Sequence, residues 1–415
     1  MQLASPGAQG IMEDRTGARF VPSTLRAEIL STLLLFGITG LTLAAPAVVG
    51  CSGAGGSSCD CVTGTPPNQA AATPTITTTA AQNGASIVTL SDSTSGATLY
   101  YTTDGTTPTP SSAQYFAPFL VASNLTVNAI AAAPPLLNSS VATQAFSPNI
   151  ASGTLVWSDE FANSGTTNAQ PNPSTWTYDT GTDCCGNNEL ETYCSWGSTA
   201  SPCSTTNPNA YVGTDGSLHV VALNPSASVY TSARLKSQGL FSFEYGRIEA
   251  RMMLPESQGM WPAFWLLGNN ITTLSWPACG EADIMEHIDG SNPPPYVGAA
   301  PPGYDWIAGS VHGGASSSAE VNGSQMYHPA GFSGAAWHTY GMIWSKGQVQ
   351  YYVDDPTNIY ATFNTSNFNG TWPFDQGPMF ILLNLAVGGS WPGNPDSTTV
   401  FPGNMLVDYV RIYTN

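Results

Sequence analysis

Residues 280–290 read GEADIMEHIDG, and this stretch decides the fold. Glu281, Asp283 and Glu286 stand among apolar residues that favour a β-strand. Successive side chains of a strand point to opposite faces, so Glu281 and Asp283 share a face, whereas Glu286 would point away. One extra residue in a β-bulge restores the alternation and returns Glu286 to the first face. We therefore predict a bulged strand with three carboxylates on one side.

The three carboxylates also suggest a chemistry. Like charges on one face repel, and their proximity raises the pKa of one of them. An ionised carboxylate beside a protonated carboxyl, about 5–5.5 Å away, is what glycoside hydrolysis with retention requires. A metal-binding cluster and an exposed acidic strand are the alternatives. Metal sites usually recruit several segments, and an exposed strand would not carry Ile284 and Met285. We interpret the strand as catalytic.

The region around this strand predicts an all-β domain. Residues 153–415 are rich in Trp, Tyr and Phe and contain many short strand-like runs, such as SLHVVAL, GRIEARMML, QVQYYVDD and MFILLNLAV. We find no long segment of helical periodicity. These features are typical of a large β-sandwich or barrel.

The segment GEADIMEHID closely resembles the catalytic strand of glycoside hydrolase family 16, in the bulged form typical of laminarinases (endo-β-1,3-glucanases). The likeness continues in the family's order through LVWSDEF, GNNELETY, YTSARLKS, YGRIEARMMLPESQGMWPAFWLLG, SVHGG, WHTYGMIW, LLNLAVGGSWPG and VDYVRIY. The resemblance implies a concanavalin-like β-jelly-roll sandwich with the catalytic strand lining a concave cleft.

The resemblance also implies residue roles. Glu281 would be the nucleophile, Glu286 the acid/base and Asp283 the assisting carboxylate. The substrate-binding positions along the cleft would be Trp261, Trp265, Asn188, Arg234 and His312. Indole faces stack on sugar rings, and Asn, Arg and His can bond hydroxyls. Core packing is the alternative for each tryptophan, and a structural carboxylate is the alternative partner of the arginine.

The family often binds a structural Ca²⁺ through a carbonyl near the first strand, a Gly carbonyl and an Asp near the last strand, and the matching positions are Glu160, Gly216 and Asp408. Oxygen ligands suit calcium. A strand-edge role is the alternative for Asp408. The expected chemistry itself requires no cofactor.

The cysteines mark departures from the family pattern. Cys184 and Cys185 stand where the family commonly has a Trp, and Cys279 is interpreted as a buried thiol. In an exported chain, pairing among Cys184, Cys185, Cys194 and Cys203 is plausible, but sequence leaves the connectivity open. A zinc site is the weaker alternative, because paired CxxC units and nearby His residues are missing.

Residues 1–50 read as an export signal of the lipoprotein type. Basic residues precede an apolar run, and VVGC at 48–51 resembles a lipobox that would place a lipid on Cys51. A membrane anchor formed by the uncleaved run is the alternative. We expect a bacterial cell-surface lipoprotein or a secreted protein, with no other membrane contact.

Two further segments precede the catalytic region. Residues 51–73 are rich in small residues and predict a flexible linker. Residues 74–148 alternate short strands with turns and predict a small immunoglobulin-like β-sandwich, which resembles the C-terminal module of chitobiases and β-hexosaminidases. We interpret it as a spacer, although Tyr100, Tyr101 and Asp104 are candidates for sugar contact.

Composition limits the partners. The 415 residues carry a formal net charge of −18, and only six of the nine basic residues follow position 26. A phosphate-binding surface is therefore excluded, and nucleic acid with it. Serine-hydrolase and nucleotide-binding motifs are also missing.

We predict a monomeric, exported endo-acting enzyme that cleaves neutral β-1,3-glucan with retention. A mixed-linkage β-1,3-1,4-glucanase, a transglycosylase and a non-catalytic glucan-binding protein are the alternatives.

Overall fold

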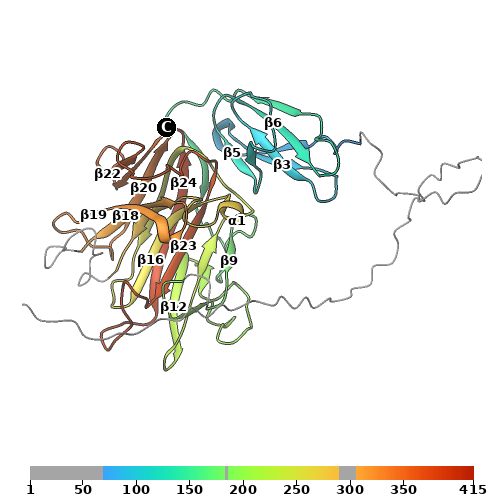
Figure 1. Cartoon of the computed structure of the whole chain (residues 1–415). Coiled ribbons are helices and arrows are strands. Elements are labelled where there is room, and N and C mark those ends of the chain that lie inside the picture. Colours follow the sequence, from blue (N-terminus) through green and yellow to red (C-terminus); the bar gives the residue numbers. More distant parts are fainter. Residues whose placement is uncertain (1–68, 183–185, 289–304) are drawn as a thin grey trace, which may run out of the picture. The chain divides into compact units, whose positions relative to one another are not determined.

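The computed structural model describes residues 69–182, 186–288 and 305–415, which form an almost entirely β structure (Figure 1). The predicted export signal, including Cys51, and most of the predicted linker lie outside the described residues. Within the described ranges, no helix is both long enough and apolar enough to span a bilayer.

The small N-terminal module is a β-sandwich, as predicted. One sheet has the order β1 (Thr75–Ala80), β2 (Ser86–Ser91), β5 (Phe119–Val121), and a 3₁₀ turn η1 (Gln82–Gly84) joins its first two strands. The other has the order β4 (Ala113–Gln114), β3 (Thr98–Thr102), β6 (Leu125–Ala132), β7 (Ala142–Phe146).

Two of the three candidates for sugar contact in this module, Tyr101 and Asp104, have structural roles. Tyr101 is buried and stacks on Phe119, with ring centroids 4.9 Å apart. Asp104 accepts hydrogen bonds from the backbone N–H and the hydroxyl of Thr106, which fixes a turn. The module also begins before the predicted boundary at residue 73, because Ala71 is buried against Ala131.

The catalytic region is built from two sheets, as the predicted jelly roll requires. The seven-stranded sheet has the order β19 (Glu320–Tyr327), β18 (Ile307–Gly314), β17 (Glu281–Glu286), β16 (Met260–Gly268), β23 (Met379–Val387), β14 (Arg234–Lys236), β9 (Thr177–Asp179). A one-turn helix, α1 (Ile271–Leu274), lies between β16 and β17, and a 3₁₀ turn, η2 (Ser317–Ala319), precedes β19.

The ten-stranded sheet forms the second layer. Its main path is β10 (Glu191–Tyr193), β13 (Val229–Ser232), β12 (Leu218–Ser226), β24 (Gly403–Tyr413), β15 (Gly246–Met253), β20 (His338–Ser345), β21 (Gln348–Val353), β22 (Ile359–Asn364). Two short strands complete it: β11 (Ala210–Val212) pairs with β12, and β8 (Leu155–Asp159) pairs with β24.

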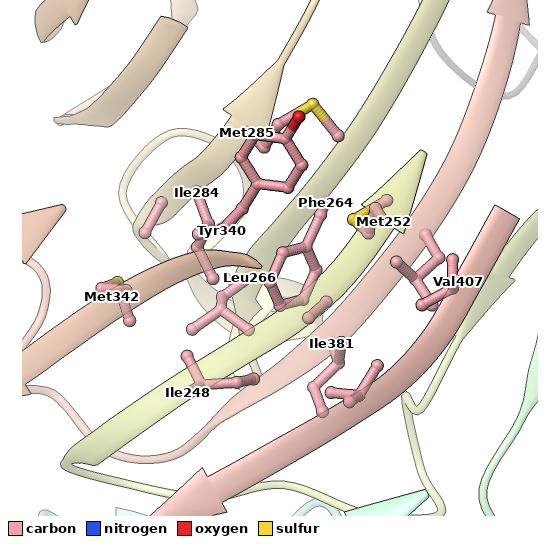
Figure 2. Close-up of a cluster of buried hydrophobic side chains, with 14 of the residues drawn as sticks. Ile248, Met252, Phe264, Leu266, Ile284, Met285, Tyr340, Met342, Ile381 and Val407 are labelled. Carbon is pink, nitrogen blue, oxygen red and sulfur yellow. The ribbon is translucent and has the colours of Figure 1, made fainter. Parts of the chain in front are cut away.

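The main core lies between these two sheets. Figure 2 shows Phe264 and Leu266 of β16 meeting Ile248 of β15 and Met342 of β20. Each strand gives alternate residues to this core, and burying one such side chain contributes about 1.5–3 kcal/mol. The other residues of the seven-stranded sheet are therefore left to face away from the core.

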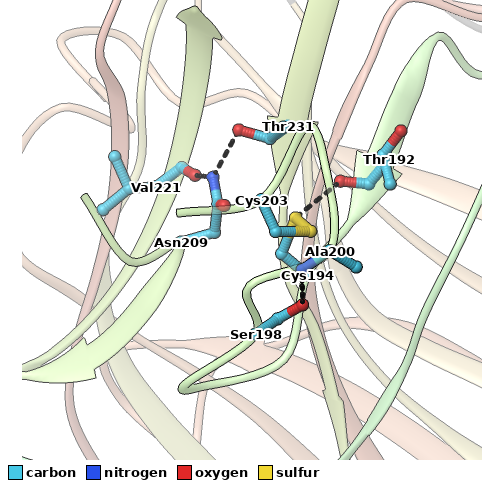
Figure 3. The surroundings of a disulfide bond; sticks show 8 residues. All are labelled: Thr192, Cys194, Ser198, Ala200, Cys203, Asn209, Val221 and Thr231. Atoms are coloured by element: carbon cyan, nitrogen blue, oxygen red, sulfur yellow. Dashed lines mark hydrogen bonds between the residues drawn. A yellow bond between two sulfur atoms is a disulfide. The ribbon is translucent and has the colours of Figure 1, made fainter. Parts of the chain in front are cut away.

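One disulfide closes a loop beside β10 (Figure 3). It joins Cys194 to Cys203, one of the pairings that the sequence left open. Nearby, the side-chain amide of Asn209 donates to the carbonyl of Val221 at 2.8 Å and to the hydroxyl of Thr231 at 3.0 Å. Cys184 and Cys185 lie outside the described residues. Cys279 is a buried free thiol, as predicted.

Candidate active site

The catalytic strand β17 contains the predicted bulge. Across to β16, Asp283 is opposite Trp265 and Met285 is opposite Phe264, so Ile284 is the extra residue. Ile284 and Met285 are consecutive, yet both pack in the main core (Figure 2). The alternation therefore shifts by one at this point. Glu286 regains the face occupied by Glu281 and Asp283.

This face of the seven-stranded sheet is the floor of a cleft of about 760 Å³. The three carboxylates line it together with Arg234, His312, Trp261 and Trp265. These seven were all predicted as site residues, and they come from β14, β16, β17 and β18. The jelly-roll register thus gathers residues that are up to 78 positions apart in sequence (312 − 234 = 78).

The groups around Glu281 shift its pKa in opposite directions. Burial and the neighbouring Asp283 raise the pKa of Glu281 to about 8. His312, Arg234 and a hydrogen bond from Trp276 act in the other direction. The indole N–H of Trp276 lies 3.0 Å from Oε2 of the carboxylate.

Glu286 lies in surroundings that favour its protonated form. Burial and Asp283 raise its pKa well above the ordinary value, with a smaller opposing effect from His312. Its Oε1 accepts the indole N–H of Trp261 at 3.1 Å. A carboxyl with a raised pKa suits the acid/base role that the family resemblance implies for Glu286.

His312 neutralises the third carboxylate. Its Nε2 lies 3.0 Å from Oδ2 of Asp283, and its Nδ1 lies 2.6 Å from Oε1 of Glu320. Burial lowers the pKa of the imidazole, but the hydrogen bonds to these two carboxylates outweigh it and raise the pKa well above 6.5. The imidazole thus lies between the two carboxylates, hydrogen-bonded to Glu320 through Nδ1 and in an ion-pair contact with Asp283 through Nε2.

Arg234 stacks on the indole ring of Trp265. The guanidinium carbon lies 4.5 Å above the indole ring, which is 9% exposed and donates to Oδ1 of Asn384 at 2.8 Å. Arg234 also forms an ion pair with Asp179 at 3.1 Å. The structural carboxylate expected as its alternative partner is therefore present, while Arg234 still lines the cleft.

The prediction for Asn188 requires a correction. Its side chain is exposed and donates to the hydroxyl of Ser390 at 2.8 Å, and its φ is 59°. The preceding residue, Asn187, lines the cleft and donates to Glu189 at 3.2 Å.

The predicted calcium residues come together, but their carboxylates are engaged. Strand β12 pairs with β24 up to Val407 and β8 pairs with it from Val410, so Gly216 and Glu160 both lie near Asp408. Two oxygens of Glu160 accept from Arg411, at 2.9 and 2.7 Å, and Asp408 pairs with Arg251 at 2.8 Å. Of the expected ligands only Asp408 would offer a carboxylate, and that carboxylate is paired with Arg251 in this arrangement, so calcium stays a prediction.

The cleft residues that sequence reasoning missed include Trp276, Glu320 and Asn384. Asn384 had a signal, because it is a lone polar residue in the buried run MFILLNLAV. Trp276 stands five positions before Glu281, on a connection whose path sequence did not reveal. Glu320 reaches His312 only through the pairing of β18 with β19.

Comparison with known proteins agrees with this geometry. The family model described as glycosyl hydrolases family 16 matches residues 198–411, and the model described as Fn3 associated matches residues 88–146. A beta-glucanase of Rhodothermus marinus is 36% identical over 271 residues, covering 62% of this chain and 84% of that protein.

Two solved structures are also similar. The laminarinase catalytic domain of Thermotoga maritima is 33% identical with a TM-score of 0.51, covering 64% of this chain and 99% of that one. The endo-beta-1,3-glucanase of Pyrococcus furiosus is 35% identical with a TM-score of 0.51, covering 63% and 94%. With its bulged acidic strand on the floor of a jelly-roll cleft, the chain belongs to glycosyl hydrolases family 16.

Proposed function

We propose that this protein is a retaining, endo-acting glycoside hydrolase that cleaves β-1,3-glucan of the laminarin type. The observation that carries the proposal is that the bulge in β17 brings Glu281 and Glu286 to one face, where both line the cleft. The names of the similar proteins, a beta-glucanase and two laminarinase-type enzymes, support the substrate class.

The reaction would proceed by double displacement. Glu281 attacks the anomeric carbon while Glu286 gives its proton to the departing glycosidic oxygen, which forms a glycosyl-enzyme. Glu286, now a base, takes a proton from water, and the hydroxide so generated releases the sugar from Glu281. His312 lies 3.0 Å from Asp283, the carboxylate beside the nucleophile.

Product analysis tests the proposal. The chain without residues 1–50 is incubated with laminarin, and the released oligosaccharides are separated by size. A ladder of short products with retained anomeric configuration at the new reducing end is expected. If laminarin gives no products but mixed-linkage glucan is cleaved, the result would instead favour a β-1,3-1,4-glucanase.

A transglycosylase and a glucan-binding protein would each leave a different signature. A transglycosylase would use the same carboxyls but give longer oligosaccharides in place of reducing-sugar release. A glucan-binding protein would retain laminarin without product, and replacing Glu286 would then change nothing. The carboxyl of Glu286, which lines the cleft and accepts only an indole N–H among the side chains described, favours catalysis, because binding alone does not need it.

Export remains part of the proposal. Lipid attachment at Cys51 would hold the enzyme at the bacterial surface, with residues 74–148 as a spacer. Fractionation of cells producing the full chain tests this. Cys51→Ala should move the protein from the membrane fraction to a soluble one, whereas an uncleaved anchor would keep it in the membrane.

A further inference from the structure

The residue that follows the acid/base is a buried histidine outside the cleft. His287 comes directly after β17, is 1% exposed, and does not belong to the described residues that line the cleft. Alternation along the chain turns its side chain away from the face of Glu286. Burying an imidazole is costly unless its polar atoms are hydrogen-bonded, so the partners of His287 are informative.

His287 is bound through its backbone and through its ring. Its backbone N–H donates to the carbonyl of Pro262 at 3.2 Å, and its Nδ1 lies 2.7 Å from the carbonyl oxygen of Trp306. A carbonyl oxygen can only accept, so Nδ1 carries a proton and donates it. Oδ1 of Asp305 lies 3.5 Å from the same nitrogen and favours that proton position. Nε2 is buried without a partner among the described residues, which suits an unprotonated nitrogen.

The carbonyl that receives this bond belongs to a fixed segment. Asp305 accepts the backbone N–H of Trp306 at 2.8 Å and that of Gly334 at 2.6 Å. Glu256, on the connection between β15 and β16, accepts the backbone N–H of Ala335 at 2.8 Å. The connection between β19 and β20 is thus bound both to the partner of His287 and to the segment that leads into β16. The ring of His287 is therefore attached to a firm anchor.

The end of β17 is held from two sides. On the side of β16, the indole N–H of Trp261 reaches Glu286 at 3.1 Å, and the carbonyl of Pro262 binds the backbone of His287. On the side of β18, the ring of His287 makes its bond to Trp306, which directly precedes that strand. Losing the ring bond would release one of the two sides next to the acid/base.

We propose that His287 is the positioning residue of the acid/base. Its bond to Trp306 fixes the backbone at Glu286, so that the carboxyl meets the departing glycosidic oxygen in the geometry for proton transfer. A displacement of about 1 Å at a reacting group costs about 100-fold in rate. The inference rests on the proposed function and adds to it a residue that acts from behind the cleft without touching the substrate.

Two substitutions of similar shape separate the hydrogen bond from packing. Asn places an amide nitrogen near the position of Nδ1 and can donate to Trp306, whereas Leu has no donor. His287→Leu should lower kcat/KM on laminarin by about 10- to 100-fold, and His287→Asn should lower it by no more than about threefold. Glu249→Gln is the control for lost stability, because Glu249 pairs with Arg247 in the ten-stranded sheet. Equal losses in the Leu and Asn variants, or a normal His287→Leu enzyme, would overturn the proposal.

The leaving group distinguishes a displaced acid from a generally damaged site. A dinitrophenolate departs without protonation, so a displaced Glu286 hardly affects its departure. On the dinitrophenyl glycoside of laminaribiose, His287→Leu should therefore keep kcat/KM within about threefold of the unsubstituted enzyme. A loss on this substrate as large as the loss on laminarin would mean that His287 has only a structural role.

A readout without substrate distinguishes failure of this inference from failure of the proposed function. In protein labelled with ¹⁵N-histidine, the ring signals that His287→Asn removes should be those of an imidazole protonated at Nδ1. A ring protonated only at Nε2 would overturn the contact even in an active glucanase. If Nδ1 is protonated but the unsubstituted protein releases nothing from laminarin, the contact stands and the substrate assignment is rejected. The Leu and Asn variants compared on mixed-linkage glucan then decide the positioning role.

Discussion

Carboxylates are paired differently on the outward face of the ten-stranded sheet and on the cleft face of the seven-stranded sheet. On the outward face, Glu249, Asp408 and Glu160 each pair with an arginine. Those three arginines, at positions 247, 251 and 411, also stack on aromatic rings with separations of 3.8, 4.7 and 3.6 Å. Arginine on the outward face thus neutralises acid and covers aromatic surface at once.

On the cleft face, the carboxyls receive much weaker compensation. Glu281 and Glu286 accept indole N–H groups, and the charged His312 is shared between Asp283 and Glu320. The hydrogen bonds from Arg411 lower the pKa of Glu160, whereas burial raises the pKa of both catalytic glutamates. The comparison teaches that full pairing goes with structural carboxylates, and incomplete pairing marks those kept for proton transfer.

The largest effect should follow from removing the proton donor. Glu286→Gln should lower kcat on laminarin by about 10²- to 10⁴-fold, because the amide cannot protonate the departing oxygen. Steady-state kinetics and circular dichroism measure activity and folding in the same preparation. Wild-type turnover in a folded Glu286→Gln protein would remove this residue from the mechanism.

The next largest effect should be a loss of stability when Glu249 on the outward face is replaced. Glu249 is buried and accepts hydrogen bonds from Tyr352 at 2.6 Å and Tyr413 at 3.0 Å, in addition to Arg247. Glu249→Gln should lower the free energy of unfolding by on the order of 2–3 kcal/mol, because the guanidinium loses its counter-charge. Denaturant titration measures the loss, and kcat of the folded fraction should not change. A loss of kcat without a loss of stability would contradict the division between the two faces.

A substitution at Glu281 in the cleft should raise the free energy of unfolding, whereas the substitution at Glu249 lowers it. The folded protein raises the pKa of Glu281 from 4.5 to about 8, so its favourable contribution is complete below pH 4.5 and is lost as pH rises toward 8. Glu281→Gln should therefore stabilise the inactive protein by on the order of 1–3 kcal/mol at pH 7 and by little at pH 4. Thermal melts at both pH values test this, and equal gains at both would contradict the titration of Glu281.

Added calcium should have the smallest effect, a small rise in Tm. The arginine pairs at Glu160 and Asp408 are partly exposed, so breaking either to admit a metal costs about 0–1 kcal/mol. Millimolar calcium should raise Tm by no more than about 3 °C over a chelator, through binding at this place. Glu160→Gln is the variant that tests the location, because it frees Arg411. A large calcium-dependent rise in Tm would mean that the carboxylates leave their arginines.

Sequence reasoning succeeded where a simple period governs the chain. The bulge followed from the parity of Glu281, Asp283 and Glu286, whereas the family resemblance placed Trp261 and Trp265 along the cleft. The resemblance also pointed to Asn188, but its neighbour Asn187 is the residue that lines the cleft. The pairing of Asp408 with Arg251 was also hidden, because β24 and β15 are far apart in sequence and meet only in the folded sheet.

The bulge also determines which length changes the catalytic strand can tolerate. Its two consecutive core residues, Ile284 and Met285, separate Asp283 from Glu286. Deleting one of them would leave a strictly alternating strand in which all three acids still share a face. Adding a third residue without a second bulge would turn Glu286 into the apolar core. Shortening this segment by one residue is therefore compatible with catalysis, whereas lengthening it by one is not.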